Sequence, residues 1–365
     1  MRARFVLLLA ALVAGCGDSP TESVPEDPRL SPDQRVVDMA VGFSTTCAVV
    51  ENGRVFCWGE NRFGEFGNGN SNGSPTPVLA MGGLRLSKIF GTQGTSRSCG
   101  ITDTGAGFCA GYDLHGELGG GADTDPSRPN PIVGGLQWHQ LASSYHTCGV
   151  TTDRRAFCWG LAYSGALGWP AATHGRHHTP GEVTGGHRFR AITTGMQFSC
   201  ALTEGEGRAY CWGSAGMLGS AFDPQATGWS PKPVAGNRSF TTISAGEYHT
   251  CALGTDRKAY CWGSDDPPFG SARLAPVLIA TPRALTHVVS GKLHTCALDD
   301  QGRALCWRTG NDVRYVADDL RFVGLAGGNE VSCGWTEGGA AYCWNFGFVH
   351  PVPRNLSRVP PFPAE

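Results

Sequence analysis

The sequence predicts an all-β fold, a seven-bladed β-propeller in which each blade has four strands. The first observation is the cysteine pattern, because fourteen of the fifteen cysteines fall into seven pairs. The two cysteines of a pair are ten residues apart in six pairs and eleven apart in one. The second observation is the repeat length, since successive pairs begin 37 to 52 residues apart. About fifty residues and four short strands are typical of one propeller blade.

Each cysteine pair lies in a predicted β-hairpin. Between Cys47 and Cys57, apolar β-formers flank the loop 51–53, whose glycine suits a left-handed turn position. This loop places Cys47 opposite Cys57 on the neighbouring strand. The fourth repeat has one more loop residue, in segment 204–207, and its cysteine step is also one residue longer. The two changes cancel, so the cysteines of this repeat are also opposed.

Opposed residues of antiparallel strands approach the separation that a disulfide needs. We therefore predict one disulfide in each hairpin of an exported protein, where oxidation is permitted. Zinc binding is one alternative, although structural zinc sites favour closer cysteine spacings. Buried free thiols are the other alternative. The predicted disulfides are Cys47–Cys57, Cys99–Cys109, Cys148–Cys158, Cys200–Cys211, Cys251–Cys261, Cys296–Cys306 and Cys333–Cys343.

Two further strands complete each repeat. A strand-like run precedes each hairpin, as in residues 35–42, and a proline-flanked apolar segment such as 74–80 or 230–235 precedes the next run. The first repeat has no proline-flanked segment ahead of it, whereas segment 351–359 follows the last hairpin. We therefore expect the N- and C-terminal segments to pair and to close the ring.

The hairpins end in glycine-rich turns, as in segments 58–67, 110–119 and 159–168. The succession G-x-x-H-T-C-A-L, Y-C-W-G and G-x-L-G resembles the repeat of the regulator of chromosome condensation family, over about residues 35–352. The resemblance implies a seven-bladed propeller in which the glycines allow tight turns and the tryptophans pack between blades. The last repeats depart from the pattern, because the turns after Trp307 and Trp344 barely match it.

Residues 1–15 are predicted to be a lipoprotein signal peptide. Two arginines precede the apolar run 5–15, which is too short to span a bilayer as a mature helix. The stretch 13–16 resembles the bacterial lipobox, in which the cysteine is acylated, so Cys16 is the predicted lipidation site. The alternative is a signal peptide without a lipidation site, in which Cys16 is an unmodified and unpaired cysteine. The predicted location is the bacterial cell envelope, on the extracytoplasmic side of a membrane, with a lipid anchor.

Residues 16–34 are predicted to be a disordered, acidic and proline-rich tether, residues 35–359 the propeller and residues 360–365 a tail. The tether carries five acidic residues and one basic residue, and the propeller that follows it is close to neutral. Nucleic acid binding depends on many contacts between basic residues and phosphates. We therefore expect no nucleic acid partner.

The histidines offer few candidates for chemistry. His146, His249 and His294 occupy the same repeat position, so we expect them to be structural. The histidine-rich segment 174–178 lies in a loop, where a metal site is the weaker alternative. No recognisable catalytic motif is present. We therefore predict no cofactor, no metal site and no enzymatic activity.

The predicted partner-binding residues are Trp169, Phe222 and Trp229. They lie in segments 169–182 and 220–233, which we expect to be loops between successive blades, and aromatic groups on such loops suit recognition. The alternative is that these side chains fold back onto the blade edges. We predict a monomeric scaffold that is anchored to a membrane and binds a protein or glycan. The other candidate functions are an envelope enzyme of hydrolase type with a site on the loop face, and a guanine-nucleotide-exchange or other regulatory activity by analogy with the family.

Overall fold

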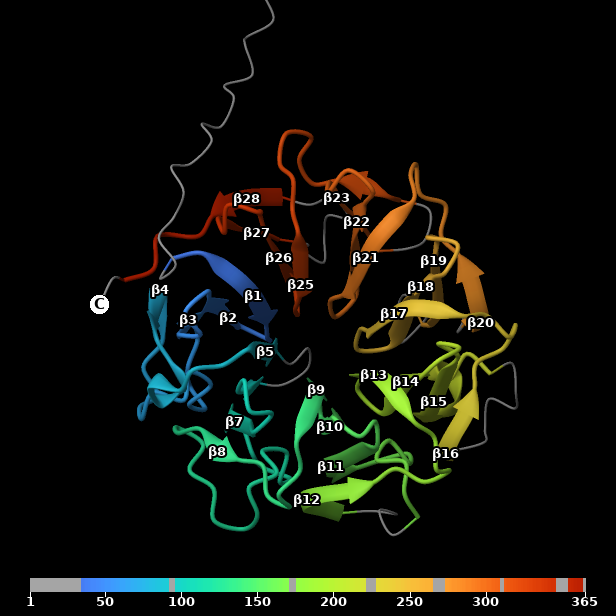
Figure 1. The fold of residues 1–365 in the computed structure, drawn as a ribbon, viewed down its shortest axis with the longest axis horizontal. Coiled ribbons are helices and arrows are strands. Elements are labelled where there is room, and N and C mark those ends of the chain that lie inside the picture. Colours follow the sequence, from blue (N-terminus) through green and yellow to red (C-terminus); the bar gives the residue numbers. More distant parts are fainter. Residues whose placement is uncertain are drawn as a thin grey trace, which may run out of the picture.

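The computed structural model is a ring of seven four-stranded antiparallel sheets around a central axis (Figure 1). The structure describes residues 34–91, 96–170, 175–220, 228–264, 273–308, 312–345 and 354–363. Two of the predicted site residues, Cys16 and Phe222, lie outside this part of the chain. Among the described residues, no helix has the length and hydrophobicity of a membrane-spanning segment. The predicted seven-bladed propeller with four-stranded blades is confirmed.

The strands follow one another along the chain, and the first strand of each blade lies nearest the axis (Figure 1). Blade 1 contains β1 (Val36–Val41), β2 (Thr45–Val50), β3 (Val55–Gly59) and β4 (Ser74–Leu79); blade 2 contains β5 (Lys88–Gly91), β6 (Arg97–Ile101), β7 (Gly107–Gly111) and β8 (Asn130–Pro131); blade 3 contains β9 (Trp138–Ser143), β10 (His146–Thr151), β11 (Ala156–Ala162) and β12 (Gly175–Glu182); blade 4 contains β13 (Phe189–Thr194), β14 (Phe198–Thr203), β15 (Ala209–Gly213) and β16 (Gly228–Pro233).

The remaining three blades have the same order. Blade 5 contains β17 (Phe240–Ala245), β18 (His249–Gly254), β19 (Ala259–Gly263) and β20 (Arg273–Leu278); blade 6 contains β21 (Leu285–Ser290), β22 (Thr295–Asp299), β23 (Ala304–Trp307) and β24 (Arg314–Tyr315); blade 7 contains β25 (Gly324–Gly327), β26 (Val331–Trp335), β27 (Ala341–Asn345) and β28 (Arg354–Arg358). Two short 3-10 turns, Met81–Gly83 and Ala215–Met217, are the helical segments of the described chain.

The proline-flanked strands belong to the hairpins that precede them, which corrects the order that we expect from the sequence. Val78 of β4 pairs with Cys57 of β3, so segment 74–80 completes blade 1 rather than opening blade 2. In the same way β28 completes blade 7 and does not supply a strand to blade 1. The physical reason is that β3 has an outer edge of unpaired backbone groups, which the next stretch of chain covers.

The first and last described segments of the chain still meet, at the seam between blades 1 and 7. The Val36 amide donates to the Gly339 carbonyl over 3.1 Å, and the Gln34 side chain donates to the Phe362 carbonyl over 3.4 Å. The Phe362 ring is buried, with its centroid 5.3 Å from that of Phe56 and 6.3 Å from that of Trp58. The ring is therefore closed here by side-chain packing and by single hydrogen bonds, with a separate sheet on each side of the seam.

All seven predicted cysteine pairs are disulfide-bonded, with Cα–Cα distances of 4.0 to 4.1 Å. In every blade the two cysteines face each other in the register of the hairpin, as Cys47 faces Cys57. This includes Cys200 and Cys211, where the longer loop and the longer cysteine step cancel. The sulfur atoms are packed against the next blade, since Cys148 Sγ lies 3.4 Å from Ser199 Oγ.

Three histidines join neighbouring blades. Nε2 of His146 lies 2.7 Å from Ser199 Oγ, that of His249 lies 2.9 Å from Thr295 Oγ1, and that of His294 lies 2.7 Å from Ser332 Oγ. Each hydroxyl belongs to the following blade, at the position just before its first cysteine. Burial lowers the pKa of these histidines from 6.5 to about 3, 4 and 3, in chain order. They are therefore neutral structural residues, as their shared repeat position indicates.

Tryptophans and glycines of the repeat meet across the same interfaces. The indole of Trp159 donates to the Glu117 carbonyl of the preceding blade over 2.9 Å, and that of Trp212 donates to the Ala166 carbonyl over 2.8 Å. A Cβ atom at Gly119 would lie 2.6 Å from the Trp159 ring, which no side chain can tolerate without a shift. The packing of these tryptophans between blades, which the family resemblance implies, is confirmed.

We predict that the disulfides contribute directly to the stability of the ring. Replacing both Cys148 and Cys158 by Ala removes a bond that closes a loop of about eleven residues, and should lower the free energy of unfolding by about 2–4 kcal/mol. Urea unfolding followed by tryptophan fluorescence measures this change. An unchanged unfolding midpoint, or peptide mapping that links Cys148 to a cysteine of another blade, would contradict the prediction.

We also predict that acid destabilises the protein through the three buried histidines. Their pKa is lower in the folded state, so the unfolded chain binds protons first and stability falls as the pH drops from about 6.5 to about 3. Asp38 and Glu65 act in the opposite direction, because burial raises the pKa of both carboxyl groups, that of Asp38 to about 6, but the three histidines outnumber them. In His146→Gln, which does not titrate, the unfolding free energy should fall less steeply with pH. An equal slope in both proteins would contradict this.

Candidate functional site

The two faces of the ring carry different connections. Because the four strands of a blade alternate in direction, the turn after the first strand and the connection after the third strand emerge at the same end. We call this end the loop face; in blade 1 it contains segments 42–44 and 60–73. The opposite end, the hairpin face, contains the cysteine hairpin turn 51–54 and the link 80–87 to the next blade. The segments that we expect to join blades, such as 169–182, therefore lie within a blade.

Large apolar side chains are exposed on one side of the loop face. Phe43, Phe63, Leu114 and Tyr163 are 43%, 46%, 50% and 52% exposed. They come from the consecutive blades 1, 2 and 3, in turns or in connections between the third and fourth strands. The Phe63 ring makes an edge contact with Tyr112 of blade 2, with 5.2 Å between the ring centroids. These residues, which we call the aromatic patch, lie at the end of the ring where the longest connections emerge.

The connections that carry this patch are held by their own side chains. In blade 1 the Glu65 carboxylate accepts the Phe63 amide over 2.9 Å, and the Asn61 side chain accepts the Phe66 amide over 2.8 Å. The Asn61 side chain also donates to the carbonyls of Asn70 and Asn72. Glu65 and Asn61 are each about 1% exposed. Buried polar groups with satisfied hydrogen bonds fix a loop in one conformation, so the patch is presented on a rigid support.

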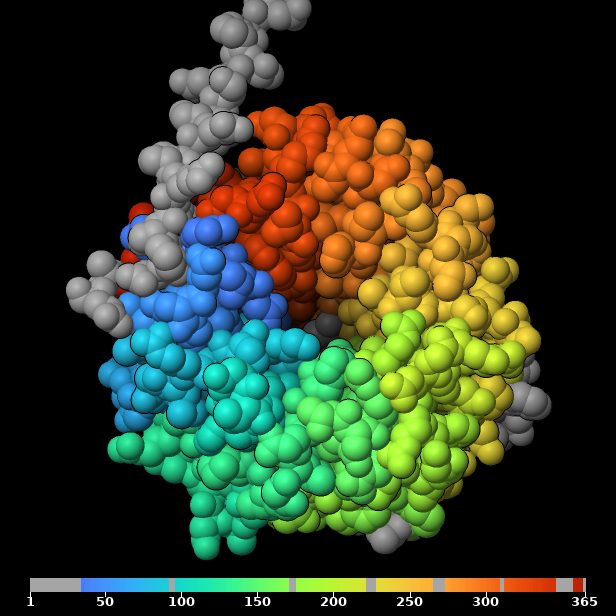
Figure 2. All heavy atoms as spheres, in the orientation of Figure 1, coloured from blue at the N-terminus to red at the C-terminus, as the bar shows by residue number. Residues whose placement is uncertain are grey.

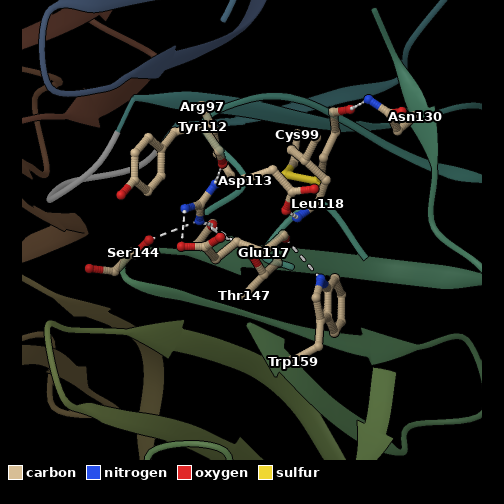
Figure 3. Close-up of a disulfide and its surroundings, with 12 residues drawn as sticks. Arg97, Cys99, Tyr112, Asp113, Glu117, Leu118, Asn130, Ser144, Thr147 and Trp159 are labelled. Atoms are coloured by element: carbon tan, nitrogen blue, oxygen red, sulfur yellow. Dashed lines mark hydrogen bonds and ion pairs between the residues drawn. A yellow bond between two sulfur atoms is a disulfide. The ribbon is translucent and has the colours of Figure 1, made fainter. Parts of the chain in front are cut away.

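Blade 2 repeats this arrangement and adds a buried ion pair. The Glu117 carboxylate accepts the His115 amide over 2.8 Å and pairs with the Arg97 guanidinium at 3.3 Å, and both side chains are almost completely buried. Arg97 occupies the position that histidines hold in other blades, and donates to Ser143 Oγ and the Ser144 carbonyl of blade 3 over 2.6 and 2.8 Å (Figure 3). Burial lowers the Arg97 pKa while Glu117 opposes that change. This pair is a structural tie beneath the patch.

The structure places the two described tryptophan candidates at the outer rim of blades 3 and 4. Trp169 is half-buried; its indole donates to the Cys158 carbonyl over 3.2 Å, and its ring contacts His177 with 4.7 Å between centroids. Trp229 is half-buried in β16, beside Gly165 of the neighbouring blade. Trp169 therefore folds back onto its own blade, in the manner that the sequence leaves open as the alternative.

The segment around His177 and His178 forms β12 rather than a loop. Burial lowers the pKa of His177, and its ring faces Trp169. In the described part of the chain, no three His, Cys, Asp or Glu side chains are grouped in a way that could hold a metal ion.

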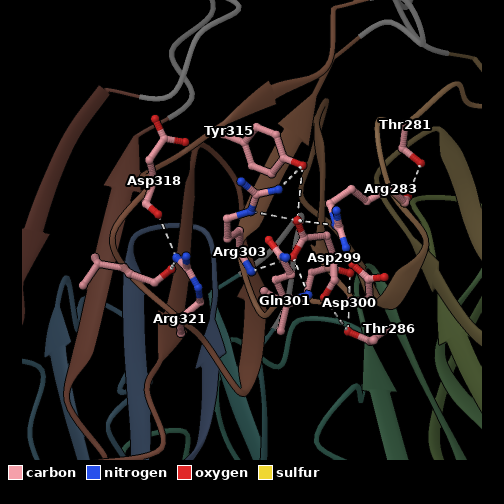
Figure 4. A network of polar contacts seen from close by, with 12 residues as sticks. Thr281, Arg283, Thr286, Asp299, Asp300, Gln301, Arg303, Tyr315, Asp318 and Arg321 are labelled. Atoms are coloured by element: carbon pink, nitrogen blue, oxygen red, sulfur yellow. Dashed lines mark hydrogen bonds and ion pairs between the residues drawn. The ribbon is translucent and has the colours of Figure 1, made fainter.

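The hairpin face carries polar side chains that bond to one another. In blade 6 the Asp299 carboxylate accepts the backbone amides of Gln301 and Arg303, both over 2.9 Å, and also the Arg303 guanidinium (Figure 4). The Tyr315 hydroxyl donates to the same carboxylate over 3.2 Å. Guanidinium groups also lie over aromatic rings on this side of blades 1, 3, 5 and 6. These polar groups satisfy one another, although Leu79, Val277, Leu278 and Val323 are also exposed at this end of the ring. The loop face has aromatic rings on connections that buried side chains hold in place, so its aromatic patch is the stronger candidate for recognition.

The sequence alone did not predict the aromatic patch, because its residues lie in turns whose glycines already account for the repeat pattern. The available signal was that Phe63, Leu114 and Tyr163 are apolar at positions where the other copies of the turn carry different residues. Such positions are free from the packing that fixes the repeat.

Comparison with known proteins agrees with the repeat pattern. The model of the "Regulator of chromosome condensation (RCC1) repeat" matches residues 36–65, 142–166 and 240–266, and a second model of the same repeat matches residues 52–94. The ultraviolet-B receptor UVR8 of Arabidopsis thaliana is 29% identical over 257 residues, which are 68% of this chain and 58% of the receptor. The human E3 ubiquitin-protein ligase HERC2 is 25% identical over 218 residues, 55% of this chain and 4% of the ligase. The chain thus matches less than two thirds of the length of either relative.

Solved structures show the same fold at low sequence identity. Human WBSCR16 has a TM-score of 0.71 and 18% identity, with 82% of this chain and 86% of that chain covered. Prp20p from Saccharomyces cerevisiae has a TM-score of 0.70 and 18% identity, with 90% and 88% covered. The repeat matches show that this chain contains repeats of the regulator of chromosome condensation (RCC1) type, and its seven-bladed ring has the fold of the solved structures that it resembles.

Proposed function

We propose that this protein is a non-catalytic scaffold that recognises another protein through its loop face and is held at an extracytoplasmic membrane surface by a lipid on Cys16. The observation that carries the proposal is the aromatic patch of Phe43, Phe63, Leu114 and Tyr163, exposed on rigidly held connections. Large apolar groups gathered on one side of a surface are typical of protein-recognition sites, whose centres are rich in aromatic residues. The half-buried Trp169 and Trp229 lie at the rim of this face.

Relatives support a binding role. The reported work on the structurally similar Prp20p describes its binding to Gsp1p and histones, and UVR8 is a receptor. The match to HERC2 covers 4% of that ligase, so ligase activity is not carried over to this chain. The three repeat histidines support a non-catalytic role, because each is buried and bonded to a hydroxyl of the next blade. A hydrolase or a guanine-nucleotide exchange factor is the alternative, and turnover or exchange by the purified protein would favour it.

We predict that lipidation of Cys16 holds the protein at the membrane. In a bacterial expression host, Cys16→Ser should move the protein to the soluble fraction or leave the precursor unprocessed, since the acyl chains supply the membrane affinity. Fractionation and mass spectrometry of the mature N-terminus measure this. If the protein that retains Cys16 carries no lipid at its mature N-terminus and is still found in the membrane fraction, the prediction is contradicted.

We predict that the aromatic patch contains the main binding contacts. In a pull-down from envelope extract, the double variant Phe63→Ser, Leu114→Ser should lose at least about thirtyfold in affinity for the captured protein, because two central apolar contacts are removed. Both side chains are exposed, so the melting temperature should change little. The matched control is Leu79→Ser, an exposed apolar residue on an outer strand.

The double variant Trp169→Ala, Trp229→Ala tests the rim of the same face. If these residues anchor the partner, capture is lost and the melting temperature is unchanged; a lower melting temperature with capture retained makes them packing residues.

Equal capture by the wild type and the Phe63→Ser, Leu114→Ser variant would overturn the proposed binding face. Loss of capture on deglycosylation of the extract would identify a glycan as the ligand.

A further inference from the structure

The hairpin face of blade 5 carries a group of basic side chains. Arg238 is exposed in the link that precedes β17, and Arg257 and Lys258 are exposed in the turn between β18 and β19. Arg190 of blade 4 reaches the same place, because its guanidinium donates to two backbone carbonyls of β17. We call these four residues the basic patch. The link and the turn lie side by side, since the Thr255 amide donates to the Ser239 carbonyl over 3.1 Å.

The arginines of the basic patch bond to neutral groups. The Arg257 guanidinium donates to the Leu285 carbonyl over 3.5 Å. The guanidinium carbon of Arg238 lies 4.3 Å from the centre of the Tyr260 ring. Carbonyls and an aromatic ring fix the position of a guanidinium but do not cancel its charge. The patch therefore keeps its positive charge.

The acidic side chains nearby do not neutralise the patch. Asp256 belongs to the same turn, and its carboxylate accepts the Tyr260 hydroxyl over 2.7 Å, so one acid faces four basic residues. The other carboxylates on this side of blades 4 and 6 are paired with arginines outside the patch: Glu206 with Arg208, Asp299 with Arg303 and Asp300 with Arg283.

Exposed aliphatic side chains lie beside the basic patch. Val277 and Leu278, at the end of β20, are 44% and 49% exposed, and Leu278 lies opposite Tyr260 in the register of the blade. Three more exposed aliphatic residues lie on the hairpin face near the seam of the ring, namely Val37, Leu79 and Val323. Basic and apolar side chains on one surface suit a membrane interface, where the charges meet anionic headgroups and the apolar groups enter the acyl boundary.

The chain also enters the ring on the hairpin face, because β1 begins there and runs toward the loop face. Figure 2 shows blade 1, in blue, and blade 5, in yellow to orange, on opposite sides of the ring. A lipid anchor upstream of blade 1 and the basic patch of blade 5 would therefore hold the same face at two separated points. The loop face, with its aromatic patch, then points away from the membrane.

We propose that the hairpin face binds an anionic lipid surface, with the basic patch of blade 5 against the headgroups and with Val277 and Leu278 at the acyl boundary. The inference rests on the proposed membrane location of this protein and adds an orientation to it. Each basic side chain near an anionic membrane favours the bound state by about fivefold, and salt screens this attraction. The aromatic patch stays accessible to a protein partner while the opposite face contacts lipid.

The test is co-sedimentation of the oxidised full chain carrying Cys16→Ser with lipid vesicles, so that no acyl chain contributes. The protein should bind vesicles of phosphatidylcholine and phosphatidylglycerol in equal parts, should bind phosphatidylcholine alone much more weakly, and should be released by high salt. The double variant Arg257→Gln, Lys258→Gln should bind the anionic vesicles about twentyfold more weakly, because two charges are removed. Leu278→Ser should also weaken binding, since it removes apolar surface from the contact.

The matched control is the double variant Arg62→Gln, Arg128→Gln, which removes two positive charges from exposed side chains of the loop face. It has the same net charge as the Arg257→Gln, Lys258→Gln variant and should bind the anionic vesicles as tightly as the Cys16→Ser protein. The melting temperatures of all these variants should be close to one another, because each substituted side chain is exposed.

The proposal is overturned if the Cys16→Ser protein does not bind the anionic vesicles, if phosphatidylcholine alone binds it as tightly, or if the loop-face control weakens binding as much as the blade 5 variant. Binding to heparin without binding to anionic vesicles also overturns it and identifies a soluble polyanion as the ligand. The protein in this test carries no lipid, so its failure is distinct from a failure of lipidation at Cys16 or of capture by the aromatic patch.

Discussion

The contact between neighbouring blades is the interaction on which the rest of the structure depends. A single four-stranded sheet cannot bury both of its faces, so each blade is stable only against the next. The contact has the same layers around much of the ring. A disulfide packs against a hydroxyl group of the next blade, and a histidine forms a hydrogen bond with the same hydroxyl. A tryptophan packs beneath a glycine-rich turn of the neighbouring blade. The short cross-strand disulfide suits this interface because it packs as a compact apolar group while it fixes the hairpin register.

The same interface explains where the chain can vary. Residues in the contact layers must match both blades, as Arg97 does when it replaces a histidine and brings its own buried partner, Glu117. A charge buried without a partner would cost several kcal/mol, so the two residues function as a unit. The connections on the loop face are outside this layer. They differ in length and sequence between blades, and exposed apolar side chains such as Phe63 and Tyr163 occur there.

The inner strands have a different constraint. Seven sheets that meet at an axis leave a space that is lined by their first strands, and most of the residues opposite the first cysteines in these strands are small. Polar side chains of these strands also bond across the interfaces; Gln140 accepts the Ile192 amide and Ser244 accepts the Ser290 amide. The ring is thus tied on its inside by hydrogen bonds while a cavity remains open along the axis.

The sequence by itself determined the features that depend on local geometry. The number of blades, the hairpins and the seven cysteine pairings follow from spacing, because opposed positions in a hairpin are set by the length of its own loop. The shared position of His146, His249 and His294 was also enough to predict a structural role.

Only the tertiary structure decided which hairpin each proline-flanked strand joins, since such a segment lies between two hairpins and could pair with either. It also decided which aromatic side chains reach solvent. Trp169 bonds to the Cys158 carbonyl and is half-buried, whereas Phe63 is exposed, and neither outcome follows from local sequence. The physical reason is that the burial of a side chain depends on the segments that pack against it in the folded protein, and those segments are distant along the chain.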